Sequence, residues 1–288
     1  MTSIVLIPGI LGSNLFIDGA ARRPIWRLPS NISANDLRLP DPPGRVIVAD
    51  GVNQCYEPML RGLQIAFDVR LFAYDWRRSV AENAARLQQF VVDQRLDRFH
   101  IVAHSMGGLI ARVWIGAHPE LFRGKLVMLG TPNHGSWVAP ALLGLETTGL
   151  SLASPLAILS AFLAEFHIRL TADLLAAACT WLGAWDLLPH DHTGHAAREL
   201  HTNVPSDVRL RHAAIDRAPF DPVRMHYIGG VLPTPDLDAN ALFPLGDLVV
   251  PLRIGLVHAH DPVERHAVDH VKLTMDPLVI ASVVARLS

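Results

Sequence analysis

The chain has 288 residues, a formal net charge of −2 at pH 7 and hydrophobic residues at 50% of its positions. This length is enough for one large domain, or for one domain with an insertion, and for a substantial core. The basic residues are scattered, without the positive stripe typical of nucleic-acid binding, so we expect no nucleic-acid partner. The two cysteines, Cys55 and Cys179, lie far apart and do not form a disulfide framework.

Short apolar runs alternate with helical patterns along most of the chain. Strands are expected at residues 3–7, 67–74, 99–103, 125–129, 224–228 and 253–258, and helices at residues 56–63, 79–95, 106–118 and 278–287. Ser79 and Glu82 have capping-box spacing, and Asp276-Pro277 marks the start of the last helix. This alternation predicts an α/β protein with a mainly parallel sheet that helices cover on both faces.

The first expected strand begins almost at Met1, which leaves no room for a secretory signal, so we expect a cytoplasmic protein. The strand ends at the turn Pro8–Ser13, whose glycines permit tight backbone conformations. Residues 18–50 are rich in proline, glycine and asparagine, and we expect little regular structure there.

The alternation stops between residues 137 and 220, where apolar helical patterns at 152–166 and 174–188 dominate. The uncharged stretch 147–164 approaches the length of a membrane span, but it contains proline, glycine, serine and threonine. We interpret it as part of a cap and expect no transmembrane segment. The chain is therefore predicted to be a single domain with a core of residues 1–136 and 221–288. A helical cap at about 137–220 is inserted between two late strands, and the oligomeric state stays open.

Residues 99–108 (FHIVAHSMGG) join an expected strand to an expected helix through a tight turn with Ser105 at its centre. A serine in this context is typical of a nucleophile elbow, which exposes the hydroxyl at the end of a sheet. The first small residue of the motif is Ala103 instead of glycine. Such strings also occur by chance, so the hypothesis depends on whether the chain supplies a base and an acid.

A nucleophilic serine needs an imidazole base that a carboxylate orients, and in one known arrangement the chain order is Ser, Asp or Glu, His. The candidate acids are Asp236, Asp238 and Asp247, and the candidate bases are His258, His260, His266 and His270. We favour Asp247 because a glycine turn and an apolar run bound it. We favour His270 over His266 because it lies just before the final helix. His258 and His260 are too close to the end of the expected strand 253–258.

Attack by serine on an ester also requires two N–H donors where the oxyanion forms. The backbone of Met106, directly after Ser105, provides one donor. Ile10, after Pro8-Gly9, is the best candidate for the second, with Leu11 as the alternative.

Fifteen histidines also suggest a metal-dependent hydrolase as an alternative. His190-Asp-His192 with His195, and His266 with His270, could be interpreted as ligand sets. There is no HExxH motif and no cysteine set, so we expect no catalytic metal and no cofactor. A structural zinc beside the serine site is compatible with the sequence.

Five motifs in chain order resemble the lecithin:cholesterol acyltransferase-like branch of the α/β-hydrolases, and in particular its bacterial esterases and lipases. They are PGILGS (8–13), YDWRR (74–78), AHSMGG (103–108), LGTPNHGS (129–136) and GDLVVP (246–251). The resemblance covers residues 3–136 and 224–288, and residues 137–220 correspond to the cap by position only. It implies an α/β-hydrolase fold and a cofactor-free esterase, lipase, phospholipase or acyltransferase.

The resemblance also implies Ser105 as nucleophile, Asp247 as acid, His270 as base, and Ile10 and Met106 as oxyanion donors. The chain departs from the family pattern at Leu248-Val249, where the family usually has Gly-Thr. The apolar cap indicates a lipid-like or otherwise hydrophobic ester and transient contact with a lipid interface. Transfer of the acyl group to an alcohol is the nearest alternative, and a non-catalytic ligand-binding module on the same fold is a further one.

Overall fold

A parallel sheet forms the centre of the molecule in the computed structural model, which describes residues 1–288 except 29–30, 146–154, 166–167, 203, 233–245 and 259–260. Its strands are β1 (Ser3–Ile7), β6 (Asp68–Leu71), β7 (Phe99–His104), β8 (Leu126–Leu129), β9 (Met225–Gly230) and β10 (Val263–His266). They lie in the order β10-β9-β8-β7-β1-β6, and every neighbouring pair is parallel. The predicted parallel α/β architecture is confirmed.

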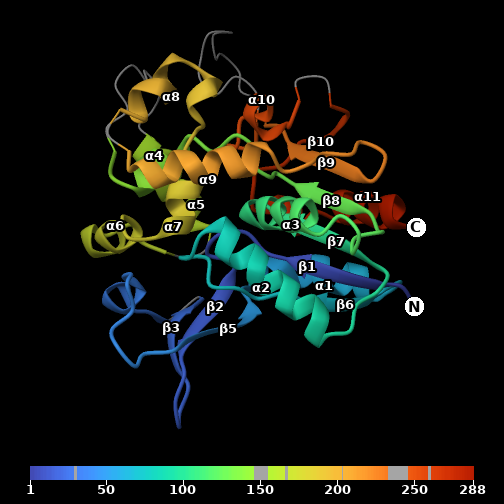
Figure 1. Ribbon diagram of the computed structural model, residues 1–288, viewed down its shortest axis with the longest axis horizontal. Helices are drawn as coiled ribbons and strands as arrows, with labels where there is room; N and C mark the ends of the chain where they lie inside the picture. The colour runs from blue at the N-terminus through green and yellow to red at the C-terminus, as the bar shows by residue number, and fades with distance from the viewer. Residues whose placement is uncertain (29–30, 146–154, 166–167, 203, 233–245, 259–260) are drawn as a thin grey trace.

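Helices cover both faces of this sheet (Figure 1). α2 (Val80–Asp93) and α3 (Met106–Ala117) lie on one face, and α1 (Glu57–Gln64) and α11 (Pro277–Leu287) lie on the other. Alternate residues of β1 therefore enter two different cores: Val5 and Ile7 join one hydrophobic cluster, and Ile4 and Leu6 join the other. Burial on both faces explains why the strands are continuous apolar runs without polar alternation.

Two of the expected helix starts are confirmed in detail. The Ser79 hydroxyl accepts a hydrogen bond from the Glu82 backbone N–H, and the Glu82 carboxylate accepts one from the Ser79 N–H, at 3.2 and 2.9 Å. At the start of α11, the Asp276 carboxylate accepts from the N–H groups of Leu278 and Val279. These side chains satisfy N–H groups that a helix cannot pair internally.

The expectation of little regular structure at residues 18–50 is wrong. This region forms most of a second, antiparallel sheet with the strand order β4-β3-β2-β5, built from β2 (Ser13–Ile17), β3 (Arg23–Arg27), β4 (Asn31–Ile32) and β5 (Ile47–Val52). Its strands are short and half-exposed, so they lack the apolar runs of the central sheet. The buried ring of Trp26 anchors the second sheet, because it packs edge-on against Trp76 at a centroid distance of 5.0 Å.

The expected strand at residues 253–258 is also wrong. Leu252–Gly255 is the short helix α10, whose Ile254 and Gly255 N–H groups bond to the carbonyl of Pro251. The last strand is β10, which begins at Val263. A short apolar run has no periodicity that separates a buried strand from a buried helix, so the sequence pattern could not decide.

A helical insertion, residues 138–216, connects β8 to β9. Its elements are α4 (Val138–Leu142), α5 (Pro155–Ala164), α6 (Ala172–Ala178), α7 (Leu182–Asp186), η3 (Asp191–Thr193), α8 (His195–Leu200) and α9 (Ser206–Asp216). The two longer helices expected here are replaced by shorter ones. Within the described residues, no helix is both long enough and apolar enough to span a membrane.

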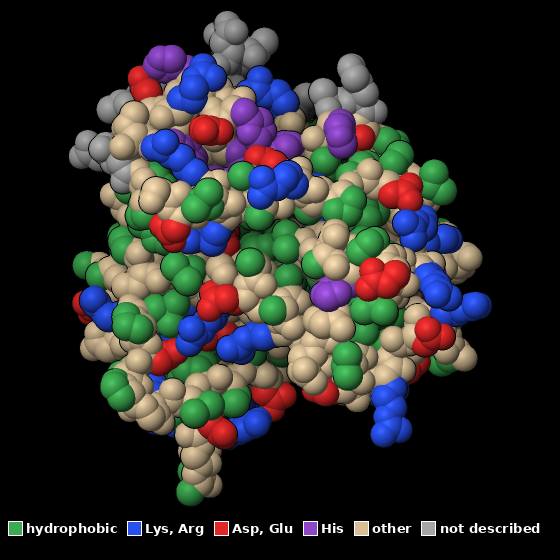
Figure 2. Space-filling view, viewed as in Figure 1, with side chains coloured by type: hydrophobic (Ala, Val, Ile, Leu, Met, Phe, Trp, Pro, Cys, Tyr) green, Lys and Arg blue, Asp and Glu red, His purple; other side chains and the backbone are tan. Residues whose placement is uncertain are grey.

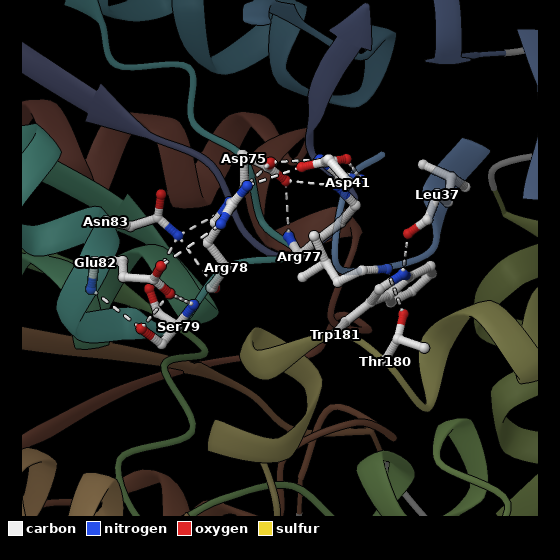
Figure 3. Close-up of polar contacts among 11 residues, drawn as sticks. Leu37, Asp41, Asp75, Arg77, Arg78, Ser79, Glu82, Asn83, Thr180 and Trp181 are labelled. Atoms are coloured by element: carbon white, nitrogen blue, oxygen red, sulfur yellow. Dashed lines mark hydrogen bonds and ion pairs between the residues drawn. The ribbon is translucent and has the colours of Figure 1, made fainter. Parts of the chain in front are cut away.

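The segment 75–78 fixes the helical insertion to the rest of the chain (Figure 3). The fully buried Arg77 guanidinium binds both carboxylate oxygens of Asp75, at 2.9 and 2.7 Å, and also binds Asp41. The Arg77 carbonyl then accepts a hydrogen bond from Gly183 of α7. Nearby, the Trp181 indole N–H donates to the carbonyl of Leu37, which ties the insertion to the segment between β4 and β5 of the second sheet.

Candidate active site

Ser105 lies in a strained turn between β7 and α3. Its backbone has φ 53° and ψ −128°, a conformation that side-chain-bearing residues rarely adopt. The Ser105 N–H donates to the carbonyl of Leu129 on β8 at 2.8 Å, which holds the turn at the carboxyl end of the sheet. The turn therefore has the geometry predicted for a nucleophile elbow.

Two glycines allow α3 to begin close to the neighbouring strands. A Cβ on Gly107 would lie 2.5 Å from the carbonyl oxygen of Pro8, and a Cβ on Gly108 would lie 2.0 Å from the hydroxyl of Thr131. Only glycine fits at such distances. The glycines that follow Ser105 in the sequence thus bring its turn against the ends of β1 and β8.

The turn also lies at the point where the order of the sheet reverses. From β1 the chain proceeds to β6 on one side, and then returns to β7 and continues to β10 on the other side. In open α/β sheets, ligands bind outside the carboxyl ends of the strands at such a switch point. The loop after β1 and the turn after β7 meet there, since a Cβ on Gly9 would lie 2.8 Å from the Cβ of Ser105.

Asp247 and His270 form a buried pair. The His270 Nδ1 lies 2.6 Å from Asp247 Oδ2, and each side chain is at most 3% exposed. The other carboxylate oxygen accepts from the N–H groups of Val249 and Val250, at 3.1 and 2.7 Å. The His270 backbone N–H also donates to the Asp247 carbonyl at 3.0 Å. Because Nδ1 donates to the carboxylate, the His270 Nε2 carries a lone pair that can accept a proton.

The Ser105 hydroxyl and the His270 Nε2 each have no hydrogen-bond partner among the residues that the structure describes. Both residues lie near His104. His104 directly precedes Ser105, and its ring centroid lies 4.7 Å from that of His270. Hydrogen bonds between a nucleophile and its base are often long without substrate and tighten when substrate binds.

A chain of buried hydrogen bonds connects the loop after β1 to the backbone of His270. The Gly9 N–H donates to the Tyr56 hydroxyl at 2.8 Å, and this hydroxyl lies 2.8 Å from His104 Nδ1. The His104 Nε2 lies 3.0 Å from the His270 carbonyl, which can only accept, so Nε2 carries the proton and Nδ1 accepts from Tyr56. The direction of every bond in the chain is thereby fixed.

Burial keeps the members of this chain neutral. Burial raises the pKa of Tyr56 above its ordinary value, so the phenol keeps the proton that it donates. Burial, with a smaller contribution from His270, holds the pKa of His104 well below its ordinary value. The His104 ring is therefore neutral at pH 7. A positive charge that forms on His270 would have no second imidazolium beside it.

The two expected oxyanion donors lie on either side of this point. Met106 is the first residue of α3, so no carbonyl within the helix accepts from its N–H. Ile10 lies in a turn closed by a 3.1 Å hydrogen bond from Gly12 to Gly9, and no described residue accepts from its N–H. Leu11, the alternative, has φ 64°, and its carbonyl accepts from Trp26.

A small cavity of about 60 Å3 lies beside Asp247 and His270. Phe162 of α5 contributes to its wall, and its ring packs edge-on against that of His270 at 6.2 Å between centroids. Leu248, Val249 and Val271 also line the cavity, as do Glu165 and Asp269. The helical insertion thus covers the histidine side of the site with an aromatic residue.

The other candidates take different positions. His266 is the last residue of β10 and its Nε2 bonds to Glu264, and His258 bonds to Asp261 on the surface. The last strand is β10 and not residues 253–258, so the reason given for setting His258 and His260 aside is wrong. His270 as the base stays a prediction. His195 pairs with Glu199 on α8. Asp236, Asp238 and His260 lie outside the described residues.

Four residues near the site were not singled out from the sequence. They are Tyr56, His104, Gly130 and Thr131. Gly130 has φ 54°, and a Cβ there would lie 2.8 Å from Asp247 Oδ2 and 3.0 Å from His270 Nδ1. His104, Gly130 and Thr131 lie within motifs quoted above, but nothing in those motifs indicates what the three residues contact.

The sheet order, the helices on both faces and the turn after β7 define an α/β-hydrolase fold. A solved structure titled as the Tle4-Tli4 complex is similar over 99% of this chain and 97% of its own, with a TM-score of 0.68 and 13% identity. At this identity the likeness shows the fold alone.

Lower structural similarity extends to proteins named as hydrolases. The lipase BlEst2 of Bacillus licheniformis is 14% identical over 100% of this chain and 92% of its own. The enol-lactonase of Burkholderia xenovorans LB400 is 15% identical over 99% and 91%, and the TM-score is 0.48 for both. No protein-family model and no curated protein sequence matches the chain.

Proposed function

We propose that the chain is a serine hydrolase that cleaves hydrophobic carboxylic esters through an acyl-enzyme. Ser105 is the nucleophile, His270 the general base and Asp247 the carboxylate that orients it. The backbone N–H groups of Met106 and Ile10 bind the oxyanion. The resemblance to the lecithin:cholesterol acyltransferase-like esterases and lipases supports the same assignment.

The observation that carries the proposal is the buried 2.6 Å contact between Asp247 and His270. The Asp247 carboxylate and the His270 Nδ1 are both buried and hydrogen-bonded. Among the described residues, the pair then has one unpaired polar atom, His270 Nε2. An unpaired buried polar atom costs about 1–3 kcal/mol, so its retention beside a paired carboxylate supports a functional role. Its position near the Ser105 turn supports a role in proton transfer.

In the first half of the reaction, the Ser105 Oγ attacks the ester carbonyl carbon and its proton moves to His270 Nε2. The carbonyl oxygen becomes an oxyanion that accepts from the Met106 and Ile10 N–H groups. One such donor is worth about 2.7–4 kcal/mol of barrier in related sites. When the intermediate collapses, the C–O bond breaks, and the alcohol leaves with the proton from Nε2.

In the second half, water replaces the alcohol. His270 Nε2 takes a proton from water, the resulting hydroxide equivalent attacks the acyl carbon, and Ser105 leaves with that proton. Throughout, Asp247 accepts from Nδ1–H and stabilises the charged imidazole without taking its proton.

The substrate class follows from the surroundings of the site. Phe162 and the valine and leucine side chains around the small cavity offer apolar contacts to an acyl or alkyl group. The helical insertion that covers the site is rich in alanine and leucine. We therefore expect esters with an apolar acyl chain, with access at a lipid interface.

The experiment compares turnover of p-nitrophenyl esters by the wild type, Ser105→Ala and a matched control, Ser160→Ala, whose serine is exposed on α5. Ser105→Ala should lose turnover by several orders of magnitude and keep its circular dichroism spectrum, while Ser160→Ala keeps its activity. Equal turnover by Ser105→Ala and the wild type would disprove the assignment. Product analysis with an added alcohol then separates hydrolysis from acyl transfer, because only a transferase forms the new ester in preference to the acid.

A further inference from the structure

A second cluster of chemically active side chains lies outside the serine site. His134 follows β8, His190 and His192 flank the start of η3, and Asp216 ends α9. One ligand atom from each of these four residues lies within 4.8 Å of the others. In Figure 2, histidine side chains gather on the same face of the molecule, over α8, α9 and α10.

The distances from Asp216 to the three histidines lie on either side of those in a metal site. In a tetrahedral zinc site, ligand atoms lie about 3.4 Å apart because Zn–N bonds are about 2.1 Å long. Asp216 Oδ1 lies 2.8 Å from His190 Nδ1 and 3.1 Å from His134 Nδ1. Asp216 Oδ2 lies 3.7 Å from the Nδ1 of His192. These three values bracket the expected separation.

The three imidazole rings approach from different directions. Their planes cross at 75–84°, with centroids 4.9–5.8 Å apart. Stacked histidines would lie parallel and share no common point. Nearly perpendicular rings around one carboxylate can each direct a nitrogen toward a common ion, and the four ligand atoms lie within 4.8 Å of one another.

The tautomer of His134 supplies an independent argument. Its Nε2 lies 2.9 Å from the Val257 carbonyl, which only accepts, so Nε2 carries the proton. In the neutral ring, Nδ1 then has a lone pair that faces the Asp216 carboxylate at 3.1 Å. Two acceptors at this distance need either a proton or a metal cation between them, and a metal ion would meet this need without charging the ring. A backbone carbonyl that binds the outer nitrogen of a ligating histidine is a common feature of zinc sites.

The ion-pair partners that the described residues offer to Asp216 are groups that carry a charge only when protonated. Among the described residues Asp216 pairs with histidines only, and with no lysine or arginine. The nearby Arg112 is already bound to Asn133 and to the carbonyls of Ala218 and Pro219. A divalent cation would balance this carboxylate.

The backbone fixes the spacing of two of the four residues. The His190 N–H donates to the His134 carbonyl at 3.0 Å, and the His134 N–H donates to the Ile254 carbonyl at 2.9 Å. Gly135, with φ 97°, packs against the backbone of Leu188 and Pro189, where a Cβ would lie 2.3–2.5 Å away. His190 is buried, whereas the His192 side chain is 50% exposed, which gives an ion access from solvent.

We propose that His134, His190, His192 and Asp216 bind one zinc ion, which joins the loop after β8 to the helical insertion. Three imidazoles and one carboxylate suit zinc better than calcium or magnesium, which prefer oxygen ligands. Four protein ligands leave no open position, so the ion has a structural role. This departs from the expected ligand sets, because His195, His266 and His270 are not part of the cluster.

The site is also connected to the serine centre. His134 belongs to the same loop as Gly130, which lies against Asp247 and His270. In the same loop, the Ser136 hydroxyl donates to the Val249 carbonyl at 2.6 Å. Zinc would therefore hold the loop that supports the acid, although metal binding itself does not depend on the proposed esterase activity.

The test is a titration of chelator-treated full-length protein with zinc alone, followed by calorimetry, with metal content measured after desalting. The wild type should bind one equivalent and unfold at a higher temperature with zinc. Cobalt should replace zinc and give the intense visible absorption of a four-coordinate site.

Three variants separate this site from adventitious binding. Asp216→Asn keeps the shape of the side chain, and His192→Ala changes a side chain that is half-exposed. Each variant should lower zinc affinity about 100-fold or more, because even changes to residues that only support the ligands cost about 10–100-fold. His195→Ala removes a neighbouring histidine that is 80% exposed and should bind zinc like the wild type. An absence of saturable one-to-one binding, or equal affinity in the wild type and the first two variants, would overturn the proposal. Loss of esterase activity with zinc binding intact would affect only the proposed function.

Discussion

His104 Nε2 donates a 3.0 Å hydrogen bond to the backbone carbonyl of His270, and so connects the residue before the proposed nucleophile to the proposed base. The same ring accepts from Tyr56, which in turn accepts from the Gly9 N–H beside the expected oxyanion donor. One buried chain of hydrogen bonds thus holds three parts of the proposed site, which come from three distant segments of the sequence.

This series of hydrogen bonds predicts that Tyr56→Phe lowers kcat by a larger factor than it changes KM. The variant leaves the Gly9 N–H and His104 Nδ1 unpaired in a buried place, at a cost of about 1–3 kcal/mol for each group. Turnover of a short ester and urea unfolding measure the two effects. Tyr227→Phe is the control, since its buried hydroxyl donates to the Thr131 carbonyl and has no part in the chain. A comparable loss of kcat in both variants would show that the effect is only structural.

The neutral state of His104 predicts a pH dependence of stability. Burial lowers the pKa of His104 far below its ordinary value of 6.5, with a smaller contribution from His270, and the His270 carbonyl only partly opposes this. Tyr56 and His270 are the titratable groups in contact with its ring. Below about pH 6.5 the unfolded chain binds a proton that the folded protein excludes, so the free energy of unfolding falls as the pH falls, by up to about 1.4 kcal/mol per pH unit.

Replacing His104 by asparagine should remove this contribution. Urea unfolding between pH 7.5 and 5 measures the slope in both proteins. A smaller slope in His104→Asn than in the wild type is expected. Identical slopes would mean that His104 takes up its proton equally in the folded and unfolded states.

Gly130→Ala should reduce activity strongly. A Cβ would lie within 3.0 Å of both Asp247 Oδ2 and His270 Nδ1, so the pair would have to separate. Gly144→Ala is a matched control, because Gly144 also has a positive φ of 65° but no atom of the described residues lies within 4 Å of its Cβ position. Both variants should lose about 1 kcal/mol of stability from backbone strain. Only Gly130→Ala should lose most of its kcat, and equal activity in the two variants would refute the role of Gly130.

Leu248→Gly should stabilise the protein. Leu248, directly after Asp247, has φ 78° and a partly exposed side chain. The family that the chain resembles usually has glycine at this position. Glycine adopts this conformation without strain, and we expect a gain of about 1 kcal/mol in the free energy of unfolding. Thermal unfolding measures the gain. A loss of stability would mean that the apolar contacts of Leu248 outweigh its backbone strain.

The sequence predicted the parts of the molecule whose chemistry restricts both residue type and order. The buried strands are continuous apolar runs. Asp247 and His270 were chosen for their order in the chain and lie 2.6 Å apart, while the triad that they would form with Ser105 stays a prediction. The chain from Tyr56 to His104 to His270 could not be predicted, because its members lie 48 and 166 residues apart and share no pattern.

Only part of the histidine cluster could be seen in the sequence, because its members also lie far apart. His190 and His192 form a visible motif, but His134 comes from the loop after β8 and Asp216 from the end of α9, and only the folded chain brings them together. The second sheet was missed because its short strands carry charged and turn-forming residues, and Trp26 stabilises it through a contact with a distant tryptophan.

Reaction with a fluorophosphonate tests the central claim most directly, because this probe labels a serine only when a neighbouring base and an oxyanion site activate it. We predict one label per chain, found on the peptide that contains Ser105, with labelling much slower in Asp247→Asn and absent in Ser105→Ala. Folded wild-type protein that stays unlabelled, or a label on a different residue, would contradict the account.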